Sequence, residues 1–142
     1  MHKYFIFFLL ILSKASFSQV EISWQDLEDV EFSEIYNDSI GEYFLYPHFG
    51  FNVRELEGTQ VELSGYILAL DPEEHYYILS KGPFASCFFC GAGGPETIVE
   101  LSLKSDNIFF VMDEFTTIRG ILKLNHNDIY RCNYILENAT EK

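Results

Sequence analysis

The chain has 142 residues and a formal net charge of −13, and 17% of its residues are aromatic. This length suits one domain with its own hydrophobic core. The many aromatic and β-branched residues in its middle favour strands over helices. The charge argues against nucleic acid as a partner, because phosphate backbones are bound by clustered Lys and Arg.

Residues 1–18 have the pattern of a secretory signal peptide. They contain a short basic start (His2-Lys3), an apolar run from Tyr4 to Leu12, and a small-residue cleavage site at Ser16–Ser18. The apolar run is shorter than the roughly 20 residues of a transmembrane helix. We therefore expect a mature, single-domain protein of residues 19–142, exported to the periplasm or beyond, without stable membrane insertion.

The first part of the mature chain predicts a short helix followed by a hairpin. The stretch 23–29 begins with a serine that is followed three residues later by an acidic residue, which is typical of a helix start. Strands are expected at 30–36 and 42–46, on either side of the turn-rich residues 37–41. Pro47 is expected to end the second strand.

Apolar and polar residues alternate more regularly in the rest of the chain. An apolar ribbon at 49–56 leads to five predicted strands, at 61–70, 76–80, 97–103, 116–124 and 130–137. Gly65 lies on the apolar face of the first, where a glycine lets a long strand bend around a small barrel.

These elements predict an all-β fold, a small five-stranded barrel of the oligonucleotide/oligosaccharide-binding (OB) type, preceded by the short helix and hairpin. The helix that OB barrels usually have between the third and fourth strands is not expected, because residues 105–114 lack a helical period. A small β-sandwich is therefore the alternative.

The candidate site is the loop from Pro83 to Glu96. This loop places Cys87 and Cys90 at a Cys-x-x-Cys spacing among aromatic residues, and a glycine-rich turn that ends at Pro95 follows them. The strands on either side of the loop are expected to act as its scaffold.

Three segments carry further motifs in a fixed order. They are Trp24-x-Asp26-Leu27, then Leu56-x-Gly58-x-x-Val61-x-Leu63-x-Gly65-Tyr66, and then Pro83 to Glu96 running into Val99. Together they resemble a family of exported bacterial proteins catalogued as domain of unknown function 3299 (DUF3299). In many relatives the loop has a cysteine, one residue, a histidine and then several prolines. Here Cys87 matches the cysteine, Cys90 lies near the place of the histidine, and Pro95 matches the prolines, so the chain is similar to a divergent Cys-x-x-Cys branch.

The resemblance implies no established reaction. It implies an accessory role beside transport systems of the cell envelope, some of them linked to zinc supply. Histidine and cysteine both bind Zn²⁺, so the exchange of Cys-x-His for Cys-x-x-Cys keeps two metal ligands.

The first interpretation of Cys87 and Cys90 is accordingly a zinc site. Two further ligands are required. A strict up-and-down order of strands would bring the loop after the fourth strand, with His126, and also Cys132, towards the two cysteines. Weaker candidates are His48, His75 and Glu96.

Two other interpretations remain open. A disulfide between Cys87 and Cys90 would form in an oxidising compartment and shape the loop for docking, and an exposed Phe88-Phe89 pair would mark that docking surface. A thiol–disulfide oxidoreductase needs a cysteine at a helix N-terminus to lower its pKa, and the glycines before Pro95 do not permit such a helix.

We therefore expect a non-enzymatic exported accessory protein that binds Zn²⁺ through Cys87 and Cys90 and works beside an envelope transporter. The alternative is a structural or protein-interaction module with a docking loop shaped by a Cys87–Cys90 disulfide, and a thiol–disulfide oxidoreductase comes third. The sequence contains no Ser-His-Asp order, phosphate-binding loop or HExxH motif.

Overall fold

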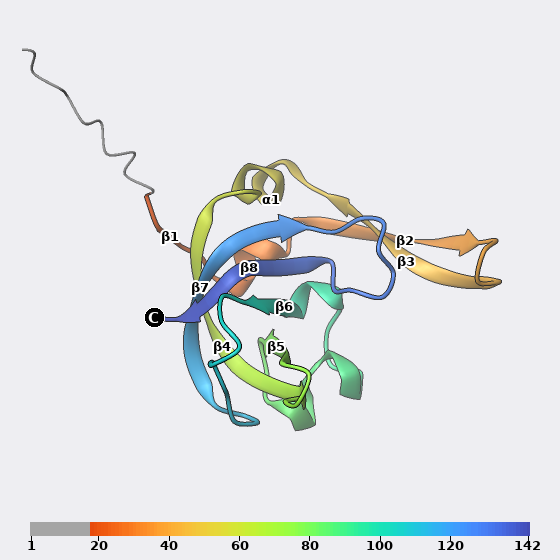
Figure 1. Cartoon of the computed structure of the whole chain (residues 1–142). Coiled ribbons are helices and arrows are strands. Elements are labelled where there is room, and N and C mark those ends of the chain that lie inside the picture. The colour runs from red at the N-terminus through yellow and green to blue at the C-terminus, as the bar shows by residue number, and fades with distance from the viewer. Residues whose placement is uncertain (1–17) are drawn as a thin grey trace, which may run out of the picture.

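The computed structural model describes residues 18–142, so the expected signal peptide lies almost entirely outside the described part of the chain. Five strands close into a barrel (Figure 1). They are β4 (Gln60–Asp71), β5 (Tyr76–Ser80), β6 (Ile98–Leu103), β7 (Phe115–Leu124) and β8 (Tyr134–Glu141). The small all-β barrel that the sequence predicts is confirmed, and the sandwich alternative is not.

The strand order gives the barrel an OB-type connection. The sheet runs β4-β5-β6-β8-β7, and β4 also pairs with β7, which closes the barrel. The pair β6–β8 is parallel and the other four barrel pairs are antiparallel. The expectation of a strict up-and-down order is therefore wrong, because β8 lies between β6 and β7. The two-residue strand β1 (Val20–Glu21) pairs in parallel with β4.

The barrel interior is filled by every second residue of the strands, as their alternation predicts. Gly65 is required there, because a Cβ atom at this position would lie 2.6 Å from the carbonyl oxygen of Ser80. The segment between β6 and β7 contains no helix, as expected. Phe110 from this segment is buried and contacts Tyr77 edge-on, with ring centroids 5.5 Å apart.

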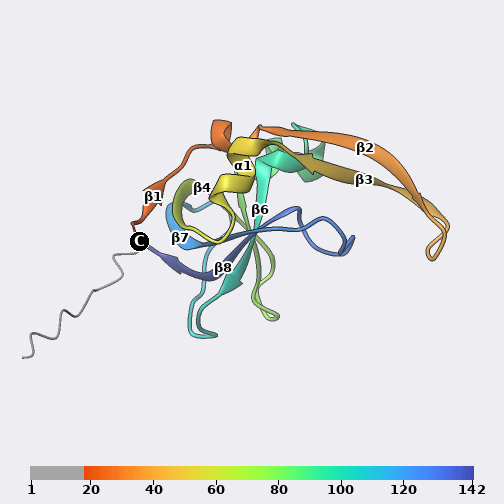
Figure 2. The ribbon, with the colours of Figure 1, turned by 90° about the horizontal axis from the view of Figure 1, so that it is seen from above.

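The N-terminal elements lie against the barrel and extend away from it. A short 3₁₀ helix spans Trp24–Leu27, and both the backbone N–H and the hydroxyl of Ser23 donate hydrogen bonds to Asp26, at 2.7 and 2.8 Å. The hairpin of β2 (Val30–Asn37) and β3 (Glu42–Phe49) projects from the body (Figures 1 and 2). Strand β3 continues through Pro47, because the hairpin is a separate two-stranded sheet in which each strand has one unpaired edge.

Residues 49–56 are not only an apolar ribbon, because they include helix α1 (Phe51–Leu56). Asp29 fixes the start of this helix. Its carboxylate accepts a hydrogen bond from the N–H of Asn52 (2.9 Å), and its carbonyl oxygen accepts one from Gly50 (2.7 Å). The capping residue therefore lies far from the helix in sequence, so neighbouring residues do not indicate where the helix begins.

The last strand begins at Tyr134, four residues later than predicted, so Cys132 lies in the loop between β7 and β8 and not in a strand. The side chain of Asn125 holds this loop in shape. Its amide nitrogen donates to the carbonyl oxygens of Asp128 (2.7 Å) and Cys132 (3.1 Å), and its amide oxygen accepts from the N–H of Asp128 (3.0 Å). In the part of the chain that the structure describes, no helix has the length and apolar character of a membrane span.

Candidate functional site

The cysteine loop, residues 81–97, is a series of short turns. Three 3₁₀ helices form it, at Phe84–Ser86, Phe88–Cys90 and Pro95–Thr97. The carbonyl oxygen of Cys87 accepts hydrogen bonds from the N–H groups of Cys90 and Ala92, both at 3.1 Å. Gly91 ends the middle turn with a φ of +85°, a conformation that a side chain disfavours.

This loop covers the outer face of the barrel wall. Leu68, Ile78 and Ile98 point outward from β4, β5 and β6, and together with the side chain of Cys87 they form a small buried cluster. Phe88 and Cys132 pack against the same cluster. The N–H of Phe84 donates to the carboxylate of Asp113 at 2.7 Å, which ties the loop to the segment before β7.

Cys87 and Cys90 differ in exposure but lie together. Both are free thiols, and Cys87 is 1% exposed whereas Cys90 is exposed. The sulfur of Cys90 donates to the carbonyl oxygen of Phe84 at 3.1 Å. Loss of hydration, the charge of the Cys87 thiolate and a hydrogen bond with Cys87 raise the pKa of Cys90 above its ordinary value. Cys87 and Cys90 are thus neighbouring thiols at the two ends of one 3₁₀ turn.

Cys132 comes from the β7–β8 loop and packs against the cluster that contains Cys87, although the up-and-down strand order from which this proximity was predicted is wrong. Its N–H donates to the carboxylate of Glu100 at 3.1 Å. The other oxygen of that buried carboxylate accepts from Nε and Nη2 of Arg131, at 2.8 and 2.5 Å. Burial and, secondly, the charge of Glu100 raise the pKa of the Cys132 thiol to about 12, so this thiol keeps its proton at neutral pH.

His126 faces away from the cysteines. Its ring packs against Phe49 and Tyr46 at the base of the hairpin, with centroid distances of 4.8 and 6.2 Å. The weaker candidates also have other surroundings. His48 shares a hydrogen bond with Ser33, His75 stacks on Phe109, and Glu96 accepts from the N–H of Gly94. Among residues 18–142, no three His, Cys, Asp or Glu side chains lie close enough together to hold a metal ion.

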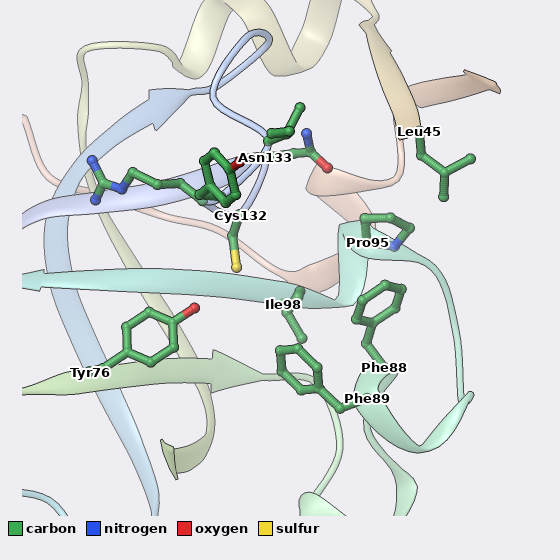
Figure 3. A pocket seen from close by; sticks show the side chains of 11 residues that line it. Leu45, Tyr76, Phe88, Phe89, Pro95, Ile98, Cys132 and Asn133 are labelled. Carbon is green, nitrogen blue, oxygen red and sulfur yellow. The ribbon is translucent and has the colours of Figure 1, made fainter. Parts of the chain in front are cut away.

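A groove of about 310 Å³ opens between the cysteine loop, the β7–β8 loop and the hairpin. We call it the cysteine-loop groove. Figure 3 shows the sulfur of Cys132 pointing into it, above Tyr76. Its lining residues are Leu45, Tyr76, Phe88, Phe89, Pro95, Ile98 and the five residues from Ile129 to Asn133.

The sequence indicated part of this groove. The Phe88-Phe89 pair and Cys132 were recognised as candidates, whereas Leu45 and Tyr76 were not. These two residues come from elements far from the cysteine loop in sequence, and only the closed barrel and the projecting hairpin bring them to it. In the structure, Leu45 is an exposed apolar side chain on the two-stranded hairpin, and this exposure is what marks it as part of a binding surface.

Comparison with known proteins yields one informative match. No protein-family profile matches this chain, and no curated protein matches it significantly. The crystal structure of a DUF3299 family protein from Pseudomonas aeruginosa PAO1 is similar, with a TM-score of 0.54 and 15% sequence identity, over 88% of this chain and 97% of that one. The resemblance that the sequence motifs indicated is thus confirmed in the fold, and this chain shares the architecture of a DUF3299 protein.

Proposed function

We propose that this protein is a non-enzymatic accessory protein of the cell envelope, and that it binds a segment of another exported protein in the cysteine-loop groove. The observation that carries the proposal is the apolar lining of an open groove. Phe89 and Tyr130 are 48% and 81% exposed at its rim. Exposed aromatic side chains around a concave apolar surface are typical of the energetic centre of protein interfaces.

The polar groups of the groove suit a binding surface better than a reactive centre. The thiol of Cys132 keeps its proton, whereas a nucleophilic cysteine must become a thiolate. The guanidinium of Arg131 is already engaged by the buried carboxylate of Glu100. These groups fix the wall of the groove, and its apolar side chains remain available for a partner. The family resemblance favours an envelope transport system as the source of that partner.

Site-specific photo-crosslinking tests the proposal. p-Benzoylphenylalanine replaces Phe89 in the exported protein, and in a matched control it replaces Phe109, which is 68% exposed on the segment before β7. We expect a discrete protein adduct from position 89 and none from position 109. The adduct should disappear when Tyr130→Asp is added, because this change places a charge at the groove rim. An adduct that forms equally from both positions, or no adduct, would refute the proposal.

Zinc binding by Cys87 and Cys90 is the second candidate, and the position of both free thiols on one short 3₁₀ turn favours it. Because the described residues supply only these two neighbouring thiols, the remaining ligands would come from a bound partner or from solvent. Zn²⁺ would then fix the conformation of the docking loop. The alternative is a Cys87–Cys90 disulfide with the same structural effect.

Intact mass and metal content separate these states. The protein is isolated from the periplasm, and its mass is measured under native conditions. The mass is measured again after the protein has been denatured in the presence of an alkylating agent, which labels free thiols. Zinc that is lost in Cys90→Ser but retained in Cys132→Ser supports the metal site. A mass about 2 Da low without metal supports the disulfide, since two hydrogens are lost when the S–S bond forms. If neither Cys87→Ser nor Cys90→Ser changes the zinc content, the zinc hypothesis is wrong.

A further inference from the structure

The cysteine-loop groove continues along the hairpin. A cavity of about 130 Å³ lies between Phe44 and Leu45 of β3 and the β7–β8 loop, and another of about 510 Å³ lies between the hairpin tip, at Ile40, and the same loop. We call these two cavities the hairpin groove. Ile129 lines both of these cavities and the cysteine-loop groove. Leu45 lines the cysteine-loop groove and the cavity of about 130 Å³. The three cavities therefore lie next to one another from the tip of the hairpin to the cysteine loop, and we call this row of cavities the channel.

Strand β3 forms one side of this channel and has an unpaired edge. Its only partner in the described structure is β2, and it lies on the side of the hairpin nearer to the β7–β8 loop (Figures 1 and 2). An unpaired strand edge presents backbone N–H and C=O groups that can pair with another chain. The hairpin therefore offers main-chain hydrogen bonds beside an apolar channel.

The charges around the channel select the kind of segment that fits. The hairpin carries four carboxylates and neither lysine nor arginine. Asp38 and Glu42 flank the hairpin residues that line the channel, whereas Glu31 and Glu34 lie on β2, the strand farther from it. Asp128 adds a further carboxylate from the opposite loop. Arg131, the cation in the channel, is neutralised by Glu100. A partner segment with lysine or arginine beside its apolar residues complements this rim, and a second copy of this acidic chain does not.

We propose that an extended segment of a partner protein, with alternating apolar and basic residues, adds as a strand to the free edge of β3. Its apolar side chains enter the hairpin groove and the cysteine-loop groove, and its cations meet the hairpin carboxylates. Because a strand advances by about 3.3 Å per residue, a segment of about eight residues matches the length of β3. This proposal rests on the proposed function and adds the binding mode and the chemistry of the partner.

Synthetic peptides and the purified full protein test the proposal. The probe is a fluorescent octapeptide that alternates lysine with valine, and its counterpart has glutamate in place of lysine. Fluorescence anisotropy should show binding of the lysine peptide that is at least about tenfold tighter than that of the glutamate peptide. Leu45→Asp should reduce this binding by at least about tenfold, and Phe109→Asp, a charge on an unrelated exposed site, should leave it unchanged.

Backbone methylation tests strand addition directly. Alternate N–H groups of an added strand face its neighbour. Two further peptides are therefore N-methylated at the lysines or at the valines. One of them should lose binding by at least about tenfold and the other should keep it.

Three outcomes would overturn the proposal. If both methylated peptides bind like the parent peptide, and Phe89→Asp abolishes binding whereas Leu45→Asp does not, the segment docks in the cysteine-loop groove without strand addition. If no peptide binds while position 89 still forms its crosslink, the partner segment has another chemistry. If sedimentation velocity shows a dimer that dissociates when Leu45→Asp is introduced, a second copy of the chain occupies the free edge of β3.

Discussion

The two faces of the barrel wall are packed in different ways. The inner face is closed on itself, and its side chains, among them Ile67 and Val99, lie fully buried among other strand residues. On the outer face of the same strands, the cysteine loop covers a small patch of Leu68, Ile78 and Ile98. The inner face thus depends on the closure of the sheet, and the outer patch depends on one loop. Changes on the inner face should affect the whole fold, whereas changes around the loop should affect the site alone.

The largest contrast should appear in thiol reactivity, since Cys90 is exposed and Cys132 is half-buried against the outer patch, with a raised pKa. With a pKa of about 12 in place of 9.0, Cys132 has a thiolate fraction about a thousandfold below that of an ordinary cysteine at pH 8. Iodoacetamide should therefore label Cys90 before Cys132 in the folded protein. The rate at Cys132 should rise about tenfold per pH unit until the pH reaches its pKa.

Peptide mass mapping after timed alkylation measures these rates. In urea the three cysteines should react at similar rates, which provides the internal control. If folded Cys132 reacts as fast as Cys90, the surroundings of Cys132 do not raise its pKa as described.

The next largest effect should be on stability from the inner face. Leu136 of β8 is 0% exposed in the barrel core. Leu136→Ala should lower the free energy of unfolding by about 2–5 kcal/mol, because it removes buried surface and leaves a cavity. Cys87→Ala on the outer patch removes a single buried atom and should cost about 1 kcal/mol. Urea denaturation compares the two variants, and an equal loss in both would contradict the distinction between the faces.

A smaller effect should follow at the contact between barrel and N-terminal helix. The hydroxyl of Tyr134 donates a buried hydrogen bond of 2.6 Å to the carbonyl oxygen of Leu27. Tyr134→Phe should cost about 1–2 kcal/mol, because that carbonyl oxygen is left buried without its donor. Hydrogen exchange should show faster opening around Trp24. Unchanged stability together with unchanged exchange would mean that the helix is held by packing alone.

The smallest effect on stability is expected at the groove rim. Phe89 is partly exposed and makes an edge-on contact with Phe88, with ring centroids 5.5 Å apart. Phe89→Ser should change the free energy of unfolding by no more than about 0.5 kcal/mol. The same variant should lose the binding proposed for the groove. A large loss of stability here would make Phe89 part of the core and remove it from the site.

The sequence predicted the parts of the fold that follow from short-range patterns. Alternation located the barrel strands, and Ser23 with Asp26 located the first helix. Helix α1 was not predicted, because the carboxylate that caps its start belongs to Asp29, which precedes the hairpin in sequence. The start of β8 was misplaced because the hydrogen bonds of Asn125 keep the preceding residues out of the strand.

The candidate site was predicted in part for the same reason. The Cys-x-x-Cys spacing identified the loop, and Cys132 joins it. His126 does not, because its side chain turns to the hairpin. A further signal was present in the sequence. Strands β4 and β5 contain runs of consecutive apolar residues, such as Tyr77-Ile78-Leu79, and a strand with two buried faces is expected to show such runs. These runs mark the patch that the cysteine loop covers.

The position of β8 also governs how the chain can fold. This strand is the last in sequence, yet it pairs with both β6 and β7. A growing polypeptide therefore leaves two sheet edges open until β8 emerges, and contacts between such distant positions form slowly. Loss of β8 would expose both edges to aggregation and proteolysis, so only a chain that contains this strand should persist as a native molecule.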